Sequence, residues 1–448
     1  MRRLALFSVL IVAAFQHTAW GYLRIHPENP RYFQETTTGA PVLIASCGGV
    51  VPTARDCDYV RQIAELRSKN ITYGRVWHFL PWGGSVAIWP WAESRTPGGF
   101  WGGRGGYKLD FNVWNPLYWN RLRDAMIRCE RAGIYCEIHL FDRCGMSPAS
   151  KDRWGNNPWA SDHNINNLET PDSSGDGTPE FYKIKDKPNL KYHQERYVRK
   201  MIDETIKCSN MIYEIENEHW AYNNPEWAAY WGKFIKDYIR EKYPDSPRLV
   251  SYSSLQEDLE AFYDRTEVDI INRHFGNEAE RNPDVLNRYI EPRWSKGKPI
   301  NIDEFANGVT DPALLRTMCW IIITSGGHFH IEDCEPSAKP FEICENIRQF
   351  KLQSKWDFIH SAPNRKLVTS QNGYCMANPG KEYVAYFPKG GKVALLLDKG
   401  CYKAQWWSTT ENKFVAATQF EHAGGEKAFD TPTTNDDWVI HIVRIDKQ

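Results

Sequence analysis

Three glutamates stand at every second position in the stretch IYEIENEHW, residues 212–220. They are Glu214, Glu216 and Glu218, and Asn217 directly precedes the last of them. In a strand, residues two apart share a face, so this spacing places the three carboxylates together. The residues before them are apolar, and a carboxylate buried in such surroundings is unfavourable unless it has a partner. The pattern therefore indicates a working site rather than a solvated sheet edge.

A second carboxylate of this kind stands in KPINIDEFANG, where Glu304 follows Asp303 at the end of an apolar run. Two facing carboxyl groups can hydrolyse an acetal, because one donates a proton to the leaving oxygen while the other attacks or stabilises the sugar cation. Ion pairing at a rim is the structural alternative for Glu218 and for Glu304. Both glutamates end a strand-like run, which favours the catalytic interpretation.

The elements that position these residues alternate between strands and helices from about residue 41 to residue 335. The expected strands are 41–46, 71–79, 134–141, 210–218, 248–253, 268–275, 299–305 and 328–333. Helices such as 115–133, or connections of helical length, separate them. Eight such units predict a (β/α)8 barrel, an α/β fold whose catalytic groups come from the C-terminal ends of the strands. The expected strands four and seven end at Glu218 and Glu304, across the barrel from one another.

The chain divides into three expected segments. Residues 1–21 are expected to be a cleaved signal peptide, because a basic MRR precedes an apolar run and a small-x-small site. Residues 22–365 form the expected catalytic barrel, and 366–448, with short alternating strands between turn residues, an all-β sandwich. We therefore expect a secreted or periplasmic protein with no membrane segment after signal cleavage; an uncleaved anchor is the alternative.

Composition narrows the class of partner. A formal net charge of -1 offers no electrostatic footprint for nucleic acid or anionic lipid. The chain holds 19 Trp and 22 Tyr, whose rings can stack on sugar faces or simply fill a core. The expected partner is a carbohydrate, namely a poly- or oligosaccharide.

The cysteines leave several pairings open. Their number is 11, so at least one thiol has no partner within the chain. Cys47 with Cys57, or Cys334 with Cys344, could each close a short loop. No C-x-x-C motif is present, so neither a redox nor a zinc motif is expected.

The motifs YEIENE and PINIDEF resemble the signatures of the clan of retaining (β/α)8 glycoside hydrolases. The resemblance implies that Glu218 is the acid/base, Glu304 the nucleophile and Asn217 the partner of the sugar 2-hydroxyl. Arg75 in YGRVWHF matches the clan's strand-two arginine, and His274 in NRHFG matches its strand-six residue beside the nucleophile. The pKa of Glu304 is then expected to be lowered and that of Glu218 raised. No cofactor is implied.

A narrower resemblance covers nearly the whole mature chain. LDFNVWNPLYWNRLRDAMIRCERAGIYCEIHLF, NPWASDHNINN and the C-terminal GKEYVAYFPKGGKVALLLDKGCYKAQWW…DDWVIHI are similar to the apiosidase-like family of secreted bacterial barrels. Members of that family end in a β-sandwich named for collagen binding. The expected strand eight, in GGHFHIED, departs from the pattern.

Further side chains on the catalytic face are expected to bind the substrate. A Gly-rich loop after strand two carries several tryptophans that we expect to form a sugar platform, although packing is the alternative. Strands three and eight also end in polar residues, for which a structural role is the alternative. The expected substrate-binding residues are Trp82, Trp89, Trp91, His139, Asp142, Trp220, His330 and Glu332.

Two metal hypotheses are weaker. His328 and His330 resemble the His-x-His of barrel metallohydrolases, but those enzymes usually carry it on strand one, where this chain has LIASCGG. The segment 171–180 resembles a calcium loop, but Lys183 occupies the position of the bidentate glutamate. No metal is therefore expected.

The function expected from the sequence is that of a secreted glycoside hydrolase with a retaining double-displacement mechanism. Glu304 would attack the sugar and Glu218 would act as the acid and then the base. The alternative is a non-catalytic carbohydrate- or matrix-binding protein on a barrel scaffold.

Overall fold

The main sheet of the protein closes into a barrel. The structure, a computed structural model, describes residues 21–79, 86–98, 106–146, 153–218, 225–255, 257–332, 334–370 and 373–445. Nine parallel strands follow the order β4-β14-β13-β12-β11-β10-β9-β6-β5. They are β4 (Ala45–Cys47), β5 (Gly49–Val50), β6 (Tyr73–Val76), β9 (Tyr135–Asp142), β10 (Met211–Asn217), β11 (Val250–Ser254), β12 (Ile270–His274), β13 (Ile300–Asp303) and β14 (His328–Ile331).

The first barrel strand is split at Gly48. β4 pairs with β14 and β5 pairs with β6, so the two short strands together close the sheet. Gly48 has φ 76°, a left-handed conformation that glycine adopts without strain, and its N–H donates to Ile331 O at 2.9 Å. Counted as one strand, β4 and β5 give the expected eight-stranded barrel, which confirms the predicted fold class.

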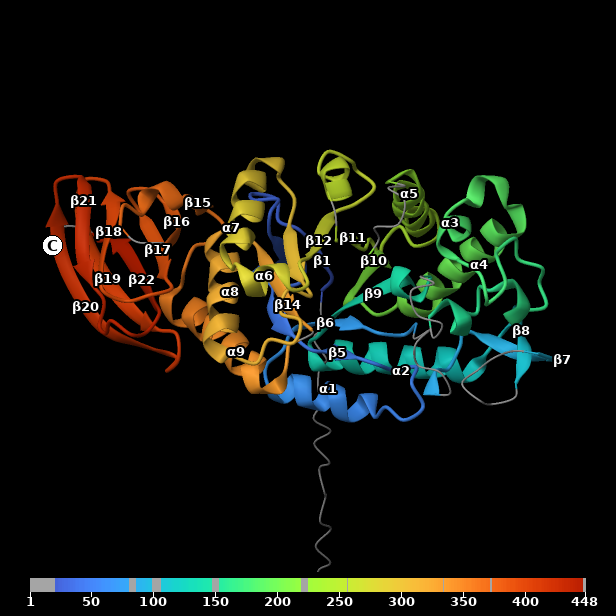
Figure 1. Cartoon of the computed structure of the whole chain (residues 1–448). Coiled ribbons are helices and arrows are strands. Elements are labelled where there is room, and N and C mark those ends of the chain that lie inside the picture. The colour runs from blue at the N-terminus through green and yellow to red at the C-terminus, as the bar shows by residue number, and fades with distance from the viewer. Residues whose placement is uncertain are drawn as a thin grey trace, which may run out of the picture.

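Helices flank the barrel (Figure 1). They are α1 (Tyr59–Ser68), α2 (Pro116–Ala132), α3 (Thr178–Phe181), α4 (Pro188–Thr205), α5 (Pro225–Lys242), α6 (Glu278–Arg281), α7 (Asp284–Ile290), α8 (Pro312–Thr324) and α9 (Pro340–Ser354). Sequence signals start two of them: Asn115 and Asp311 cap α2 and α8 through their side chains, each with Pro at the first helical position. Helix α9 was not predicted from the sequence.

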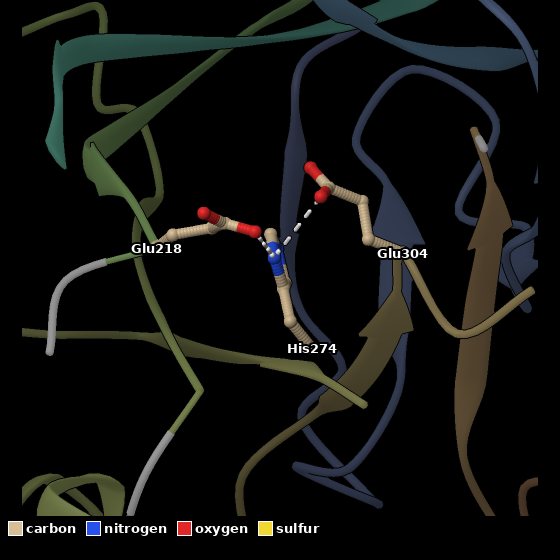
Figure 2. Close-up of side chains that lie close together, drawn as sticks. All are labelled: Glu218, His274 and Glu304. Carbon is tan, nitrogen blue, oxygen red and sulfur yellow. Dashed lines mark hydrogen bonds and ion pairs between the residues drawn. The ribbon is translucent and has the colours of Figure 1, made fainter. Parts of the chain in front are cut away.

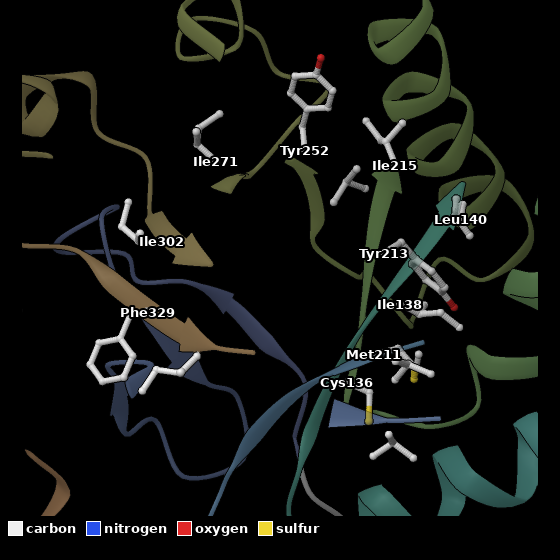
Figure 3. Packing of buried hydrophobic residues seen from close by; sticks show 14 of the residues in the cluster. Cys136, Ile138, Leu140, Met211, Tyr213, Ile215, Tyr252, Ile271, Ile302 and Phe329 are labelled. Atoms are coloured by element: carbon white, nitrogen blue, oxygen red, sulfur yellow. The ribbon is translucent and has the colours of Figure 1, made fainter. Parts of the chain in front are cut away.

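The barrel strands alternate between an apolar outer face and a polar inner face. Figure 3 shows the outer side chains of β9 (Cys136, Ile138, Leu140) and of β10 (Met211, Tyr213, Ile215) in one buried cluster. The intervening positions are buried but polar: Glu137, His139, Glu214, Asn272 and Asp303. Because buried polar groups need partners, this inner face can only be stable as a connected network.

The segment after β6 contains an antiparallel hairpin, where the sequence suggested only a loop. Its strands are β7 (Trp91–Pro97) and β8 (Tyr107–Trp114). Trp91 is only 1% exposed and stacks on Phe111 with centroids 3.8 Å apart and planes 9° apart.

The expected sugar platform on this segment is therefore wrong for two of its residues. Trp89, 7% exposed, packs edge-on against Phe79, and Trp91 belongs to the same core. The Gly-rich segment contains few residues that could pack against these tryptophans, so their burial was not predicted. Their aromatic partners include residues of β8 and of a helix distant in the sequence. Trp82 and Trp220, also expected to bind the substrate, lie outside the described residues.

The C-terminal part consists of two antiparallel sheets, drawn in orange to red in Figure 1. The larger has the order β15-β16-β17-β22-β19-β20, and the smaller pairs β18 with β21. Their strands are β15 (Ala362–Pro363), β16 (Tyr374–Asn378), β17 (Glu382–Phe387), β18 (Lys392–Leu397), β19 (Gly400–Ser408), β20 (Lys413–His422), β21 (Gly425–Asp430) and β22 (Trp438–Arg444). Val393 and Leu395 of the smaller sheet share a buried cluster with Ala385 and Ile440 of the larger.

Helix α8 joins the barrel to these sheets. Trp320 stacks on Tyr386 of β17 at 6.1 Å, and Arg316 Nε donates to Asp437 at 3.0 Å. One apolar cluster includes residues of the barrel, of α8 and of β17. The two parts therefore share a continuous core.

The N-terminal residues that are described form a small antiparallel sheet of β1 (Leu23–Ile25), β2 (Phe33–Glu35) and β3 (Pro41–Val42). Residues 1–20, which include most of the expected signal peptide, lie outside the described part. None of the helices that are described has the length and hydropathy needed to cross a membrane. No disulfide joins any of the cysteines, all of which lie in described segments.

Candidate active site

The two glutamates singled out by sequence directly follow β10 and β13. Glu218 has φ 54° and Glu304 has φ 48°, a left-handed conformation that residues other than glycine rarely adopt. Such backbone strain persists where the surroundings enforce it, and it clusters at functional sites. One oxygen of each carboxylate and one nitrogen of His274 all lie within 4.8 Å of one another. The structure therefore brings the predicted pair together.

His274 lies between the two glutamates (Figure 2). Its Nδ1 is 3.4 Å from Glu218 Oε1 and 3.5 Å from Glu304 Oε2. Its Nε2 is 3.0 Å from Asp303 Oδ1 and 3.0 Å from Ser253 Oγ. Burial alone would lower the pKa of His274, but the charges of Asp303 and Glu304 raise that pKa well above its usual value. The surrounding carboxylates therefore favour the protonated imidazole.

Arg75, fully buried, uses all four of its Nη hydrogens at this site. Nη1 donates to Glu304 Oε1 at 2.8 Å and to Glu332 Oε2 at 2.8 Å. Nη2 donates to Glu214 Oε1 at 2.6 Å and to Asn217 Oδ1 at 2.7 Å. One guanidinium thus serves three carboxylates and one amide.

The expected alternation along β10 breaks near its end. Glu214 and Asn217 are three positions apart, yet both contact Arg75 inside the barrel. Glu216 instead accepts a hydrogen bond from the hydroxyl of Tyr182 at 2.7 Å. Glu214 and Glu216 therefore bind different partners, namely Arg75 and Tyr182, the latter from the segment after β9.

Glu218 has its own set of donors. Cys144 Sγ lies 2.6 Å from its Oε2, and Arg143 Nη2 lies 3.3 Å from the same oxygen. Burial opposes ionisation of Glu218, but the bond and charge of His274, the Cys144 thiol and the charge of Arg143 outweigh it. The pKa of Glu218 is therefore lowered.

The pKa of Glu304 shifts the other way. Burial raises it well above its usual value, His274 and Arg75 offset this only in part, and Glu332 and Glu218 raise it further. The order expected from sequence is therefore reversed in the free site. The reason is that Arg75 divides its charge among several carboxylates, whereas Glu218 has donors that Glu304 lacks.

The end of β9 contributes polar atoms whose hydrogen-bonding capacity is incompletely used. Asp142 Oδ1 accepts from Asn217 Nδ2 at 3.2 Å and from the Cys144 N–H at 3.0 Å, while Oδ2 has no partner among the described residues. Burial raises the pKa of Asp142 to about 7, although the bond from Asn217 lowers it. His139 is also buried, with neither ring nitrogen bonded within the described part of the chain. These atoms could bond substrate hydroxyls.

Strand β14 places its two histidines in structural roles. His330 is buried, and its Nε2 bonds Gly48 O at 2.7 Å across the split first strand. His328 bonds the Ile44 N–H and Arg31 O through its two nitrogens, each at 2.9 Å. Both nitrogens of His328 are thus used by the backbone, which argues against a His-x-His metal site here, while the substrate contact expected of His330 stays a prediction.

Two groups of described residues have ligand atoms close enough to hold a metal ion. One consists of the two catalytic-pair glutamates and His274, and the other is the buried set Glu137, Glu214 and Asp303. Arg75 contacts a member of each set, at Glu304 and Glu214. A guanidinium thus supplies the positive charge that a metal ion would bring, and burial raises the pKa of Glu214 to about 8 despite Arg75.

Four contributors were missed by sequence reasoning: Trp77, Arg143, Cys144 and Ser253. Trp77 follows Arg75 by two positions, and its indole N–H donates to Glu332. Strand alternation could have predicted this placement, because residues two apart share a face. Arg143 and Cys144 form a short 3-10 turn after β9, for which the sequence gives no comparable signal.

No family model matches the chain, and neither does any curated protein. Solved structures do resemble it. A glycoside hydrolase family 5 protein from Bacteroides vulgatus has a TM-score of 0.65 at 14% identity, covering 95% of this chain and 94% of that one. Another solved structure, described as a glycoside hydrolase, has a TM-score of 0.65 at 13% identity over 96% and 98% of the two chains. The chain therefore shares the (β/α)8 fold of these structures, in matches that span 95% and 96% of its length.

Proposed function

We propose that this protein is a retaining glycoside hydrolase with Glu304 as nucleophile and Glu218 as acid/base. The observation that carries the proposal is the approach of the two carboxylates, whose nearest oxygens lie within 4.8 Å. Retaining enzymes hold their carboxyl groups about 5–5.5 Å apart, whereas inverting enzymes leave about 6.5–9.5 Å for a water molecule. A separation this short favours direct attack by Glu304.

In the first step, a carboxylate oxygen of Glu304 attacks the anomeric carbon. The bond between that carbon and the glycosidic oxygen breaks, and the carboxyl proton of Glu218 passes to the leaving oxygen. The product is a glycosyl ester on Glu304. Arg75, 2.8 Å from Glu304, holds the attacking group in place.

In the second step, a water molecule attacks the same anomeric carbon. Glu218, now a carboxylate, takes the proton from that water, and the ester bond breaks to restore Glu304. The sugar leaves with the configuration that it had in the substrate. Both steps place Glu218 and Glu304 on opposite sides of the reacting carbon.

The pKa directions fit this cycle if the two carboxyl groups are treated as one coupled pair. In the free site the pKa of Glu218 is lowered and that of Glu304 is raised, so Glu304 is the member of the pair that keeps its proton to the higher pH. The first step needs the same proton on Glu218. The imidazolium of His274, 3.4 Å from one carboxylate and 3.5 Å from the other, lies on the route between them.

The proposed substrate is a poly- or oligosaccharide. The unpartnered atoms of His139 and Asp142, together with Asn217, offer hydrogen bonds beside the catalytic pair. The structures that share the fold are described as glycoside hydrolases, which supports this substrate class. We also propose export of the protein, on the basis of the expected signal peptide in residues 1–21.

The test is sugar release from a broad panel of plant, algal and microbial glycans. Wild type would be compared with Glu218→Gln and Glu304→Gln, which remove the ionisable group and keep the shape. Activity on one substrate that both variants lose would support the proposal, and activity that survives in both would overturn it. Binding without turnover would favour the non-catalytic carbohydrate-binding alternative.

A further inference from the structure

Glu332, directly after β14, reaches into the catalytic network with both carboxylate oxygens. Oε2 accepts from Arg75 Nη1 at 2.8 Å, and Oε1 accepts from the indole N–H of Trp77. The side chain is 11% exposed. Because both oxygens already have partners, Glu332 has less capacity for a sugar hydroxyl than its place at the barrel mouth suggested.

The nitrogen that binds Glu332 also binds the proposed nucleophile. Arg75 Nη1 has two hydrogens, one directed to Glu304 and the other to Glu332. The remaining Nη hydrogens are directed to Glu214 and Asn217. No other Nη hydrogen is available, so any loss of Glu332 releases one that lies next to Glu304.

The charged groups that act on Glu304 come from four other strands of the barrel or from residues directly after them. The cations are Arg75 from β6 and His274 from β12, and the anions are Glu218 after β10 and Glu332 after β14. Among these anions, Glu332 is the one that binds the same Arg75 nitrogen as Glu304. It therefore acts on Glu304 twice, as a nearby negative charge and as a competitor for a cation.

We propose that Glu332 is a positioning residue that divides the Arg75 guanidinium between two carboxylates and so governs how much of that cation reaches Glu304. Its bond to Trp77 fixes the carboxylate in the place where this division occurs. The inference rests on the proposed function, since it assigns Glu332 a part in controlling the nucleophile. It concerns the charge of Glu304 and not contact with the sugar.

Glu332→Gln tests the proposal, because it removes the charge and keeps an acceptor for one of the two donors. Two like charges in such a site interact strongly enough to move a pKa by about one unit. We expect the alkaline limb of the kcat/KM pH profile, which follows loss of the proton that the pair shares, to move about one pH unit lower. Glu332→Asp, which keeps the charge, should leave that limb near its wild-type position, as should Glu335→Gln, the same change at an exposed site.

A readout on the free protein separates this inference from the proposed function. Carbon-13 NMR of glutamate carboxyl groups would follow the titration of Glu304, whose resonance is identified by its loss in Glu304→Gln. A downward shift of that titration in Glu332→Gln would support the inference even without a known substrate. An unchanged Glu304 titration, or an alkaline limb that moves equally in Glu335→Gln, would overturn it. Lack of turnover by the wild type would instead count against the proposed function.

Discussion

The guanidinium of Arg75 and the carboxylate of Glu214 are in contact at 2.6 Å, and neither side chain is exposed to solvent. This buried ion pair connects the inner face of the barrel to the catalytic pair, because the same guanidinium binds Glu304. Breaking a buried pair leaves an uncompensated charge, which is far costlier than losing a surface pair. The site and the stability of the barrel therefore depend on the same residue.

Arg75→Lys should lower the free energy of unfolding by about 3–5 kcal/mol, because an ammonium cannot serve four acceptors in this planar arrangement. Denaturant unfolding would measure the change. Arg348→Lys, at a partly exposed pair with Glu345 on α9, is the matched control and should cost less than about 1 kcal/mol. Equal effects at both sites would contradict the account.

The left-handed backbone at Glu218 and Glu304 predicts an inverted preference between alanine and glycine. Glycine adopts these φ values freely and alanine does not, so each Glu→Gly variant should be more stable than the Glu→Ala variant by roughly 1 kcal/mol. Thermal unfolding would show the order. At Glu65, in the exposed middle of α1, alanine should be the more stable by a similar amount. If the alanine variant were the more stable one at all three positions, the backbone at Glu218 and Glu304 would not be strained.

The raised pKa of Asp142 predicts a stability that falls with pH. A carboxyl group with a pKa near 4 in the unfolded chain and about 7 in the folded protein stabilises the fold fully below pH 4. That contribution is lost as the pH rises through about 7. In Asp142→Asn, the free energy of unfolding should depend less on pH across this window, and the difference from wild type should be at most roughly 4 kcal/mol. Urea unfolding at a series of pH values would measure it. Parallel pH profiles for wild type and variant, like those expected for the exposed Asp264→Asn, would contradict the prediction.

Two tryptophans, one in the core and one at the site, should separate stability from activity. Trp91→Ala removes a buried ring that stacks on Phe111 and should cost about 3–5 kcal/mol of unfolding free energy. Trp77→Phe keeps a ring and removes only the N–H that donates to Glu332. It should lower kcat/KM several-fold with about 1 kcal/mol or less of destabilisation. Wild-type kinetics in Trp77→Phe would show that Glu332 does not need the hydrogen bond from Trp77.

The strongest parts of the fold and site could be predicted from local sequence patterns. The barrel strands carry apolar residues at their outward positions, and Glu218 and Glu304 follow two of them within recognisable motifs. The hairpin of β7 and β8 could not be predicted, because Trp91 finds its stacking partner Phe111 across the pair and a Gly-rich context hides the strand.

The protonation order lay beyond sequence reasoning for a different reason. It depends on how Arg75 divides its hydrogens between Glu304 and Glu332, residues that lie far from it along the chain. It also depends on the Cys144 thiol beside Glu218. A motif gives the residue types of a site, whereas a pKa depends on every charge that the fold brings near it.

The measurement that tests the central claim most directly is the anomeric configuration of the first product, followed by proton NMR on a substrate found in the glycan panel. Attack by Glu304 followed by attack of water inverts the anomeric carbon twice, so the account predicts the same configuration as in the substrate. A first product of opposite configuration would show that water attacks directly, and it would contradict the role of Glu304 as nucleophile.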